Sequence, residues 1–388
     1  GMKSVLYTSV LQTPILLLGS LIILVLGFKE LGGWDEMMRV CGAVTVNDYG
    51  DTMTNLIRSN DDANFPWLGA LIGSAIIGFW YWCTDQFIVQ RVLSGKNEME
   101  ARRGTIFGAY LKLLPVFLFL IPGMIAFALH QKYIGAGGEG FLPMLANGTA
   151  NADAAFPTLV AKLLPAGVKG LVVCGILAAL MSSLASLFNS SAMLFTIDFY
   201  KRFRPETPEK KLVGIGQVAT VVIVILGILW IPIMRSVGDV LYTYLQDVQS
   251  VLAPGIAAAF LLGICWKRTS AQGGMWGLIA GMVIGLTRLG AKVYYSNAGE
   301  VADSTFKYLF YDMNWLFFCG WMFLFCIIVV IVVSLATKAP TAEKIQGLVF
   351  GTATKEQKAA TRASWNHWDI IHTVIILAIT GAFYWYFW

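Results

Sequence analysis

A run of serines is the densest group of chemically useful side chains in this sequence, within the apolar stretch ALMSSLASLFNSS. Ser182 and Ser186 are four residues apart, as are Ala179 and Ser183, so on a helix these positions cover one edge. Hydroxyl oxygens beside a free backbone carbonyl are ligands that a hard cation such as sodium prefers. Serines in apolar helices also bond back to their own backbone and help helices to pack. Composition alone leaves both interpretations open.

Three consecutive aromatic residues, Trp80, Tyr81 and Trp82, form a second candidate group within GFWYWCTDQ. Aromatic rings over a flat apolar face are one way to hold a sugar. The same residues are equally typical of an aromatic belt at a membrane interface or of core packing. The residue types do not decide between these interpretations.

Several ionisable residues lie within apolar stretches, where a charge is unfavourable and predicts a function by default. Lys112 lies centrally in the apolar segment 108–119, which favours a functional role. Arg288 and Asp85 lie closer to the ends of their stretches, where a side chain that reaches the interface explains them equally well.

The stretch YLQDVQSVLAPG combines polar residues with a helix-loosening pair. Gln246 and Asp247 lie in its first half, and Pro254 and Gly255 follow. Broken helices of this type commonly line transporter sites at the membrane midplane. The pattern predicts a break at Pro254–Gly255, although proline also occurs in ordinary spans.

Membrane-spanning helices must position these residues. The chain has 388 residues, of which 57% are hydrophobic and 13% charged, and its mean hydropathy is +0.67. Soluble domains carry about 25% charged residues, so the composition excludes a soluble enzyme, a disordered tail and a nucleic-acid binder. The six cysteines show no CxxC spacing and the three histidines do not cluster, so no disulfide framework or zinc site is predicted.

Nine stretches are long and apolar enough to cross a bilayer as helices, which need about 20 apolar residues. They are residues 5–28, 66–88, 105–130, 169–199, 212–233, 237–265, 273–295, 315–336 and 369–388. Unbroken apolar runs argue against a membrane β-barrel. The stretch WGLIAGMVIG at 276–285 has small faces suited to helix packing.

Basic residues concentrate in the loops after the second, fourth, sixth and eighth of these stretches, whereas the other loops hold most of the acidic residues. Because Lys and Arg favour cytoplasmic loops, the N-terminus is predicted to be cytoplasmic and the C-terminus outside. We expect an integral protein of a plasma membrane, the inner membrane in a bacterium.

Six blocks, in order along the chain, resemble the sodium/solute symporter family, and within it the sodium/glucose cotransporters. They are YTSVLQT at 7–13, WYWCTDQFIVQRVLSGKN at 80–97, AYLKLLPVF at 109–117, FPTLVAKLLPAGVKGL at 156–171, LMSSLASLFNSSAMLFTIDFYK at 180–201 and LAPGIAAAFLLGICWKR at 252–268. The blocks at 80–97 and 180–201 are long and specific.

The resemblance implies an all-α polytopic membrane protein of the leucine-transporter type, with inverted repeats that work by alternating access. Residues 1–265 would form the core transport domain, its fifth to tenth core helices, and residues 266–388 three peripheral helices. The chain is therefore expected to be N-terminally incomplete, a C-terminal fragment that does not transport by itself.

The resemblance also implies a sodium site formed by the carbonyl of Ala179 and the hydroxyls of Ser182 and Ser183. Two departures from the family pattern bear on whether a second sodium ion binds. The aspartate of the motif YTD is Ser9 here, and a threonine found in some animal members is Ala185. One sodium ion per solute is therefore expected.

The implied solute site uses Tyr81 as an aromatic gate beside Trp82, with Lys112 and Gln246 bonding sugar hydroxyls. A polar residue that usually lies three positions before the gate is Gly78 here. One sugar contact is lost at that position or replaced by water, which leaves the substrate open.

These residues predict a sodium-coupled symporter of a glucose- or galactose-like sugar in a lipid bilayer, with no nucleic-acid partner. Alternatives are a symporter for inositol, a sugar acid or an amino acid, or a non-transporting sensor. A membrane enzyme is disfavoured because no Ser/His/Asp set, metal cluster or nucleotide loop is found in the sequence.

Overall fold

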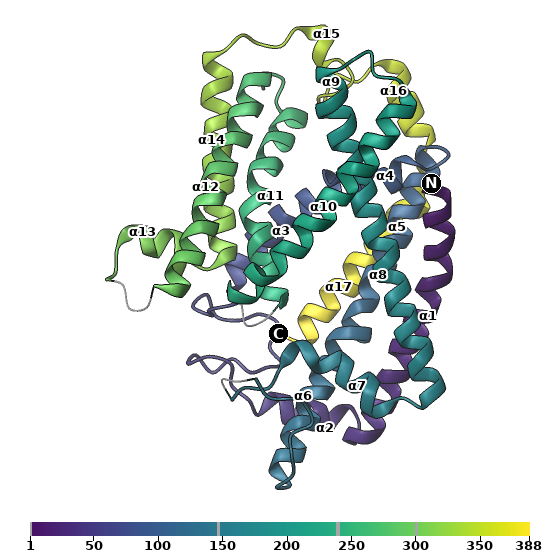
Figure 1. The fold of residues 1–388 in the computed structure, drawn as a ribbon, viewed down its shortest axis with the longest axis vertical. Coiled ribbons are helices and arrows are strands. Elements are labelled where there is room, and N and C mark those ends of the chain that lie inside the picture. Colours follow the sequence, from purple (N-terminus) through teal and green to yellow (C-terminus); the bar gives the residue numbers. More distant parts are fainter. Residues whose placement is uncertain (1, 146–147, 238–240, 299–301) are drawn as a thin grey trace. The chain divides into compact units, whose positions relative to one another are not determined.

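The computed structural model describes residues 2–145, 148–237, 241–298 and 302–388, and in these ranges the chain is helical apart from loops and isolated β-bridges. Within the same ranges eight helices are long and apolar enough to cross a membrane, or nine if one bent pair counts as a single span. Figure 1 shows these helices. The prediction of an all-α polytopic membrane protein is confirmed.

The chain divides into two compact units, and unit 1 comprises Gly1–Asn55 and Gly108–Pro232. Its helices are α1 (Met2–Leu31), α2 (Trp34–Gly42), α6 (Ile121–Gly135), α7 (Ala155–Leu163), α8 (Ala166–Leu194) and α9 (Lys201–Phe203), with the π-helices η1 (Val116–Leu120) and η3 (Phe195–Tyr200) and the 3-10 turn η2 (Ala152–Ala154). α5 (Glu98–Pro115) and α10 (Glu209–Val237) run from one unit into the other.

The core of unit 1 forms where α1 packs against α6, α7 and α8. Ile23, Ile125 and Leu159 are fully buried there. The approach of α1 to α6 is close at Gly27, where an added Cβ would lie 3.0 Å from Ile125 Cγ2. A small residue at this crossing lets two apolar helices meet, as in membrane helix pairs generally.

Unit 2 comprises Leu56–Phe107 and Ile233–Trp388. Its helices are α3 (Trp67–Cys83), α4 (Gln86–Leu93), α11 (Leu241–Cys265), α12 (Ala271–Asn297), α13 (Thr305–Lys307), α14 (Trp315–Ala336), α15 (Ala342–Ile345), α16 (Lys355–Ala363) and α17 (His367–Tyr386), with the π-helix η4 (Tyr308–Asp312). Figure 1 shows α11, α12 and α14 side by side.

A glycine stripe on α12, repeating every fourth residue, makes this three-helix packing possible. An added Cβ at Gly277 would overlap Val330 of α14, and one at Gly281 would lie 2.9 Å from the Cα of Gly255 on α11. At Gly285 the nearest atom of α11 would be only 2.6 Å away. The packing role predicted for residues 276–285 is confirmed.

The break in a membrane span lies elsewhere than the sequence suggested. α11 continues through Pro254 without interruption. Residues 66–88 were predicted to form one helix. In the structure, α3 ends at Cys83, α4 begins at Gln86, and the two helices are bent by 50° relative to each other. Asp85 caps the new helix, because its carboxylate accepts a hydrogen bond from the amide of Phe87 at 3.0 Å.

One end of unit 2 gathers the start of α14, the loop before α3 and the end of α17. The side-chain amide of Asn314 donates to the backbone carbonyl of Ala63 at 2.7 Å. The backbone amide of Leu56 donates to the carbonyl of Phe387 at 2.8 Å. These segments therefore belong to one side of the membrane.

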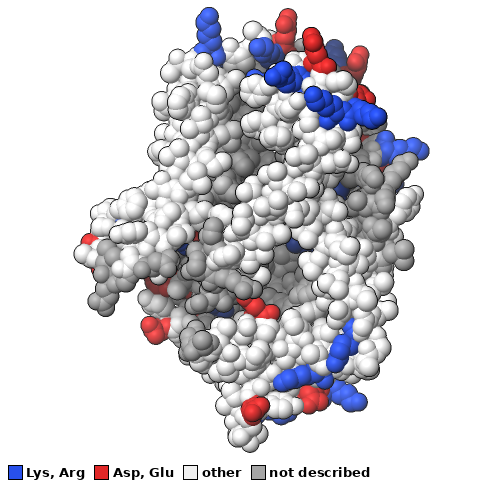
Figure 2. Space-filling model, viewed as in Figure 1, with Lys and Arg blue, Asp and Glu red and all other residues white. Residues whose placement is uncertain are grey.

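The opposite end of unit 2 gathers the ends of α11 and α14 and the start of α12. The amide of Phe350 donates to the carbonyl of Ile264 at 2.8 Å, and the amide of Ser270 donates to the hydroxyl of Ser334 at 3.1 Å. This is the basic end of unit 2, because residues 91–103, 266–270 and 337–366 supply most of its lysines and arginines. On the face drawn in Figure 2, charged side chains gather at helix ends and loops, and most of the helix flanks carry none.

Candidate functional site

The three residues predicted to bind sodium lie on one turn in the middle of α8, within a candidate membrane span that covers Ala166–Phe203. Ala179 and Ser182 are half-buried and Ser183 is exposed. The helix is continuous here, so the amide of Ser183 faces the carbonyl of Ala179 along the axis. A carbonyl oxygen has a second lone pair, which remains available to an ion.

Another serine of α8 has a structural role. Ser186 and Ser190 are buried, and the hydroxyl of Ser190 donates back to the carbonyl of Ser186 at 2.9 Å. The back-bonding interpretation of the serine run therefore applies to Ser190. Ser190 is a natural internal control for Ser182 and Ser183.

The aromatic residues Tyr81 and Trp82 lie in the last turn of α3, immediately before the helix break. Their rings meet edge to face with centroids 5.3 Å apart, and the ring of Trp80 lies 6.2 Å from that of Tyr81. The Thr84 hydroxyl donates to the carbonyl of Trp80 at 2.7 Å, which closes the end of the helix. The predicted gate is therefore next to the bend.

The break places two helix ends beside the aromatic residues. The C-terminal end of α3 carries negative partial charge and the N-terminal end of α4 carries positive partial charge. From the sequence, Asp85 was predicted to lie near the end of a single span, whereas in the structure it caps α4. The signal was present, because an aspartate before a new apolar run is a helix-start pattern.

Gln246 lies in the second turn of α11, where its side-chain amide donates to the Tyr242 hydroxyl at 3.0 Å. A solute hydroxyl would compete with Tyr242 for this donor or use the amide oxygen. α11 packs against α3 within unit 2, so Gln246 and the aromatic residues Tyr81 and Trp82 belong to neighbouring helices.

A charge cluster of the buried Arg288 with the half-buried Asp247 and Lys292 lies directly after Gln246. Arg288 is 0% exposed, and its Nη2 lies 3.4 Å from Asp247 Oδ1 and donates to the carbonyl of Met313 at 2.8 Å. Its guanidinium is 4.0 Å from the centroid of the Phe318 ring. The ammonium of Lys292 bonds the other oxygen of Asp247.

This cluster corrects one expectation from the sequence. Arg288 does not reach an interface, because it is enclosed by α11, α14 and the segment after η4. Lys292 lies one turn further along α12 and shares the carboxylate of Asp247. In the described part of the chain, Arg288 Nε is buried without an acceptor. Two cations thus share one anion, and the cluster has a net positive charge.

Lys112 lies in unit 1, three residues before Pro115 and the π-helix η1. Its side chain is exposed. π-Helical turns inside membrane helices often mark functional positions, because they loosen the backbone locally. Lys112 therefore lies directly before a local irregularity of its helix.

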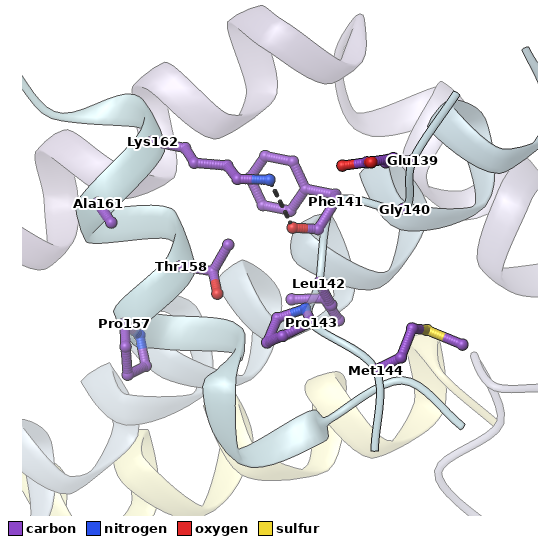
Figure 3. A pocket seen from close by; sticks show the side chains of 10 residues that line it. All are labelled: Glu139, Gly140, Phe141, Leu142, Pro143, Met144, Pro157, Thr158, Ala161 and Lys162. Atoms are coloured by element: carbon purple, nitrogen blue, oxygen red, sulfur yellow. Dashed lines mark hydrogen bonds between the residues drawn. The ribbon is translucent and has the colours of Figure 1, made fainter. Parts of the chain in front are cut away.

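Two cavities are lined by other residues. In unit 1, a cavity of about 740 Å³ lies between α7 and residues 139–144. Figure 3 shows Lys162 extending over the ring of Phe141, and its ammonium donates to the Phe141 carbonyl at 2.8 Å. In unit 2, an apolar cavity of about 520 Å³ is lined by residues of α12, α14 and η4. No residue predicted for sodium or solute belongs to either lining.

Among the described residues, no cluster of three His, Cys, Asp or Glu side chains could hold a metal ion. Such side chains are typical transition-metal ligands, whereas sodium is held by hydroxyl and carbonyl oxygens. The oxygen donors of α8 therefore remain the candidate cation ligands.

Comparison with known proteins identifies a family. The chain matches the sodium:solute symporter family over residues 1–281. It is 35% identical to a sodium/mannose cotransporter of Bos taurus over 408 aligned residues, which cover 100% of the chain and 68% of the relative.

Two further relatives are named for other solutes. The chain is 35% identical to sodium/myo-inositol cotransporter 2 of Homo sapiens, with 91% of the chain and 54% of the relative aligned. It is 37% identical to sodium/glucose cotransporter 1 of Ovis aries, with 87% of the chain and 53% of the relative aligned. The chain thus spans about half the length of these two relatives. All three are named as transporters.

Proposed function

The chain belongs to the sodium:solute symporter family, and we propose that it is part of a transporter that couples sodium to the uptake of a sugar or related polyol. The observation that carries this proposal is the family match over residues 1–281, which include every residue assigned to sodium or solute. The relatives named for mannose, myo-inositol and glucose support a polyhydroxylated solute.

The proposed sodium ligands of this chain are the carbonyl of Ala179 and the hydroxyls of Ser182 and Ser183. Polar groups on a membrane-spanning helix are unfavourable unless they serve a purpose, which supports ion binding at this turn. We propose one sodium ion per solute because Ala185 has no hydroxyl. The side chain of Ser9, the second departure, lies outside the described residues.

The proposed solute contacts are Tyr81, Trp82, Lys112 and Gln246. In this proposal, Tyr81 stacks on the solute ring, while Lys112 and Gln246 bond its hydroxyls. The helix bend after Cys83 gives α3 and α4 separate directions, and a gate at such a bend can move without displacing the whole span. Alternating access by inverted repeats, with residues 1–265 as transport core and 266–388 as peripheral helices, is part of the same proposal.

The test is uptake into proteoliposomes that contain the full native polypeptide. We expect an inward sodium gradient to drive accumulation of labelled glucose, galactose, mannose or myo-inositol. Ser182→Ala and Ser183→Ala are expected to raise the sodium concentration for half-maximal uptake several-fold. Ser190→Ala, which loses a hydroxyl that bonds within the helix, is the matched control and is expected to behave as wild type.

Uptake that does not depend on sodium would overturn the proposal. So would a Ser190→Ala variant with the same sodium response as the Ser182 and Ser183 variants, because the effect would then be structural. Absence of both uptake and sodium-dependent solute binding would favour a non-transporting sensor.

The second candidate is a symporter for another class of polar solute, a sugar acid or an amino acid. The net positive charge cluster of Asp247, Arg288 and Lys292 beside Gln246 is the observation that favours an acidic solute. Competition by glucuronate, myo-inositol and neutral amino acids against labelled glucose would rank these classes.

A further inference from the structure

The connection between α14 and α17 contains a tight turn at the basic end of unit 2. The Thr352 hydroxyl donates to the carbonyl of Ile345 at 2.8 Å, and the amide of Gly347 donates to the carbonyl of Thr352 at 3.1 Å. Gly347 and Gly351 have φ angles of +77° and +82°, a region that glycine adopts without strain. Hydrogen bonds and two glycines therefore set the shape of this turn.

The turn holds two large apolar side chains outward. Val349 is buried, whereas Leu348 and Phe350 on either side of it are each 73% exposed. Exposing large apolar side chains to water is unfavourable because of the hydrophobic effect. Neighbouring exposed apolar side chains therefore often mark an interaction surface. We call Leu348 and Phe350 the apolar tip.

A backbone hydrogen bond sets the depth of the apolar tip. The amide of Phe350 donates to the carbonyl of Ile264 at 2.8 Å, and Ile264 is the penultimate residue of the candidate span α11. Spanning helices end where hydrocarbon gives way to lipid headgroups. The backbone of the tip therefore lies level with the end of a candidate membrane span.

Lysines flank the tip. Residues 337–366 carry five basic residues and two acidic ones: Lys338, Lys344, Lys355, Lys358 and Arg362 against Glu343 and Glu356. An added Cβ at Gly351 would lie 4.0 Å from the ammonium nitrogen of Lys267, so a lysine of the α11–α12 loop adjoins the turn.

We propose that this surface binds the anionic lipid leaflet at the basic end of unit 2, with Leu348 and Phe350 among the acyl chains. Lys267, Lys344 and Lys355 contact the headgroup phosphates. Apolar insertion combined with basic side chains is how interfacial segments bind membranes. Because the turn is bonded to Ile264, lipid contact also anchors the end of α11.

The first test measures insertion of the tip in the full native polypeptide, in a background without the exposed cysteines Cys83, Cys174 and Cys265. A nitroxide is attached at Phe350→Cys or, as a control on α16, at Thr361→Cys, after reconstitution into vesicles of phosphatidylcholine with phosphatidylglycerol. We expect the label at position 350 to collide with oxygen and to be several-fold better protected from a water-soluble nickel chelate than the control.

Two other results would overturn the proposal. Equal access of the nickel chelate to positions 350 and 361 would place the tip in water. Protection of position 350 from both oxygen and nickel would show that another part of the protein covers it.

The second test concerns charge and uses the variant Lys344→Gln/Lys355→Gln. Each lysine near an anionic surface contributes about 1 kcal/mol, so each removal is expected to lower the preference for phosphatidylglycerol over phosphatidylcholine roughly fivefold. The readout is the ratio of the two lipids retained by the purified protein. Lys307→Gln, at the opposite end of unit 2, is the control. An unchanged ratio in the double variant would overturn the headgroup contact.

Discussion

Asp247 is the single carboxylate shared by two cations inside unit 2. Asp247→Asn leaves Arg288 and Lys292 without a counter-charge, and removing one partner from a buried pair destabilises by about 3–5 kcal/mol. We therefore expect a clear fall in the unfolding midpoint of the detergent-purified protein. Asp303→Asn is the control, because Asp303 pairs with Lys307 at 2.9 Å at the surface, where such pairs contribute little. Equal effects of the two variants would show that the buried cluster is not structurally important.

Cys41 offers a residue-scale prediction outside the membrane spans. The thiol is fully buried in α2 and lies 3.7 Å from the carbonyl of Met124, and burial raises its pKa from 9.0 to about 11. Because only the thiolate reacts, Cys41 is expected to resist maleimide at pH 7.5, whereas the exposed Cys265 is labelled. Mass spectrometry of the labelled peptides measures both sites.

The raised pKa of Cys41 also makes the free energy of unfolding depend on pH. Ionisation is easier in the unfolded chain, so this thiol's contribution is complete below pH 9 and is lost as the pH rises toward 11. Labelling of Cys41 at the rate of Cys265 in the folded protein would contradict its burial.

Among the helices, the glycine stripe of α12 determines how closely α11 and α14 approach. Gly281→Ala would bring a methyl group to 2.9 Å from the backbone of Gly255, and overpacking of this kind costs about 1–3 kcal/mol. Gly274→Ala is the matched control, because nothing lies within 4 Å of its added Cβ. We expect only Gly281→Ala to lower the thermal midpoint in detergent. A drop of similar size in both variants would show that the contact does not limit packing.

The broken span α3–α4 rests on the cap that Asp85 provides. Asp85→Ala removes the acceptor for the Phe87 amide, which costs about 1 kcal/mol, while Asp85→Asn keeps a capping oxygen. We expect the alanine variant to melt earlier and the asparagine variant to melt near wild type. If both melt alike, the bend is maintained by packing instead.

Local patterns predicted the helices well, and the reason is physical. Nearly continuous apolar runs have one stable form in lipid, so the spans followed from length and composition. The break was placed at Pro254–Gly255, because proline is the usual signal. In the structure, α11 is continuous through Pro254, and the interruption lies at Thr84–Asp85. There the carboxylate of Asp85 accepts a hydrogen bond from a backbone amide at the start of α4.

At the scale of the whole molecule, residues close in sequence were the predictable part of the candidate site. Ser182 and Ser183 share a turn, and Tyr81 contacts its neighbour Trp82. The pairing of Asp247 with Arg288 joins residues 41 positions apart. It depends on how α11 packs against α12, which spacing along the chain does not encode.

The arrangement of unit 2 across the membrane gives a prediction about the whole molecule. The loop around Asp61 adjoins the start of α14, through the bond of Asn314 to Ala63, and Thr361 lies beyond the end of α14 on α16. The 22 residues of α14 at about 1.5 Å each separate these positions by about 33 Å, enough to span the hydrocarbon. Because the Thr361 side is the basic one, it is expected to be cytoplasmic.

An impermeant maleimide tests this arrangement in intact cells that express the full native polypeptide without its exposed cysteines. We expect Asp61→Cys to be labelled directly and Thr361→Cys only after permeabilisation. The reverse pattern would keep α14 as a span but invert its orientation, which would place the C-terminus inside. Direct labelling of both positions would contradict a membrane crossing by α14. α17 runs from the side of Thr361 to the opposite side, where the carbonyl of Phe387 accepts a hydrogen bond from Leu56. The same experiment therefore determines on which side residue 388 lies.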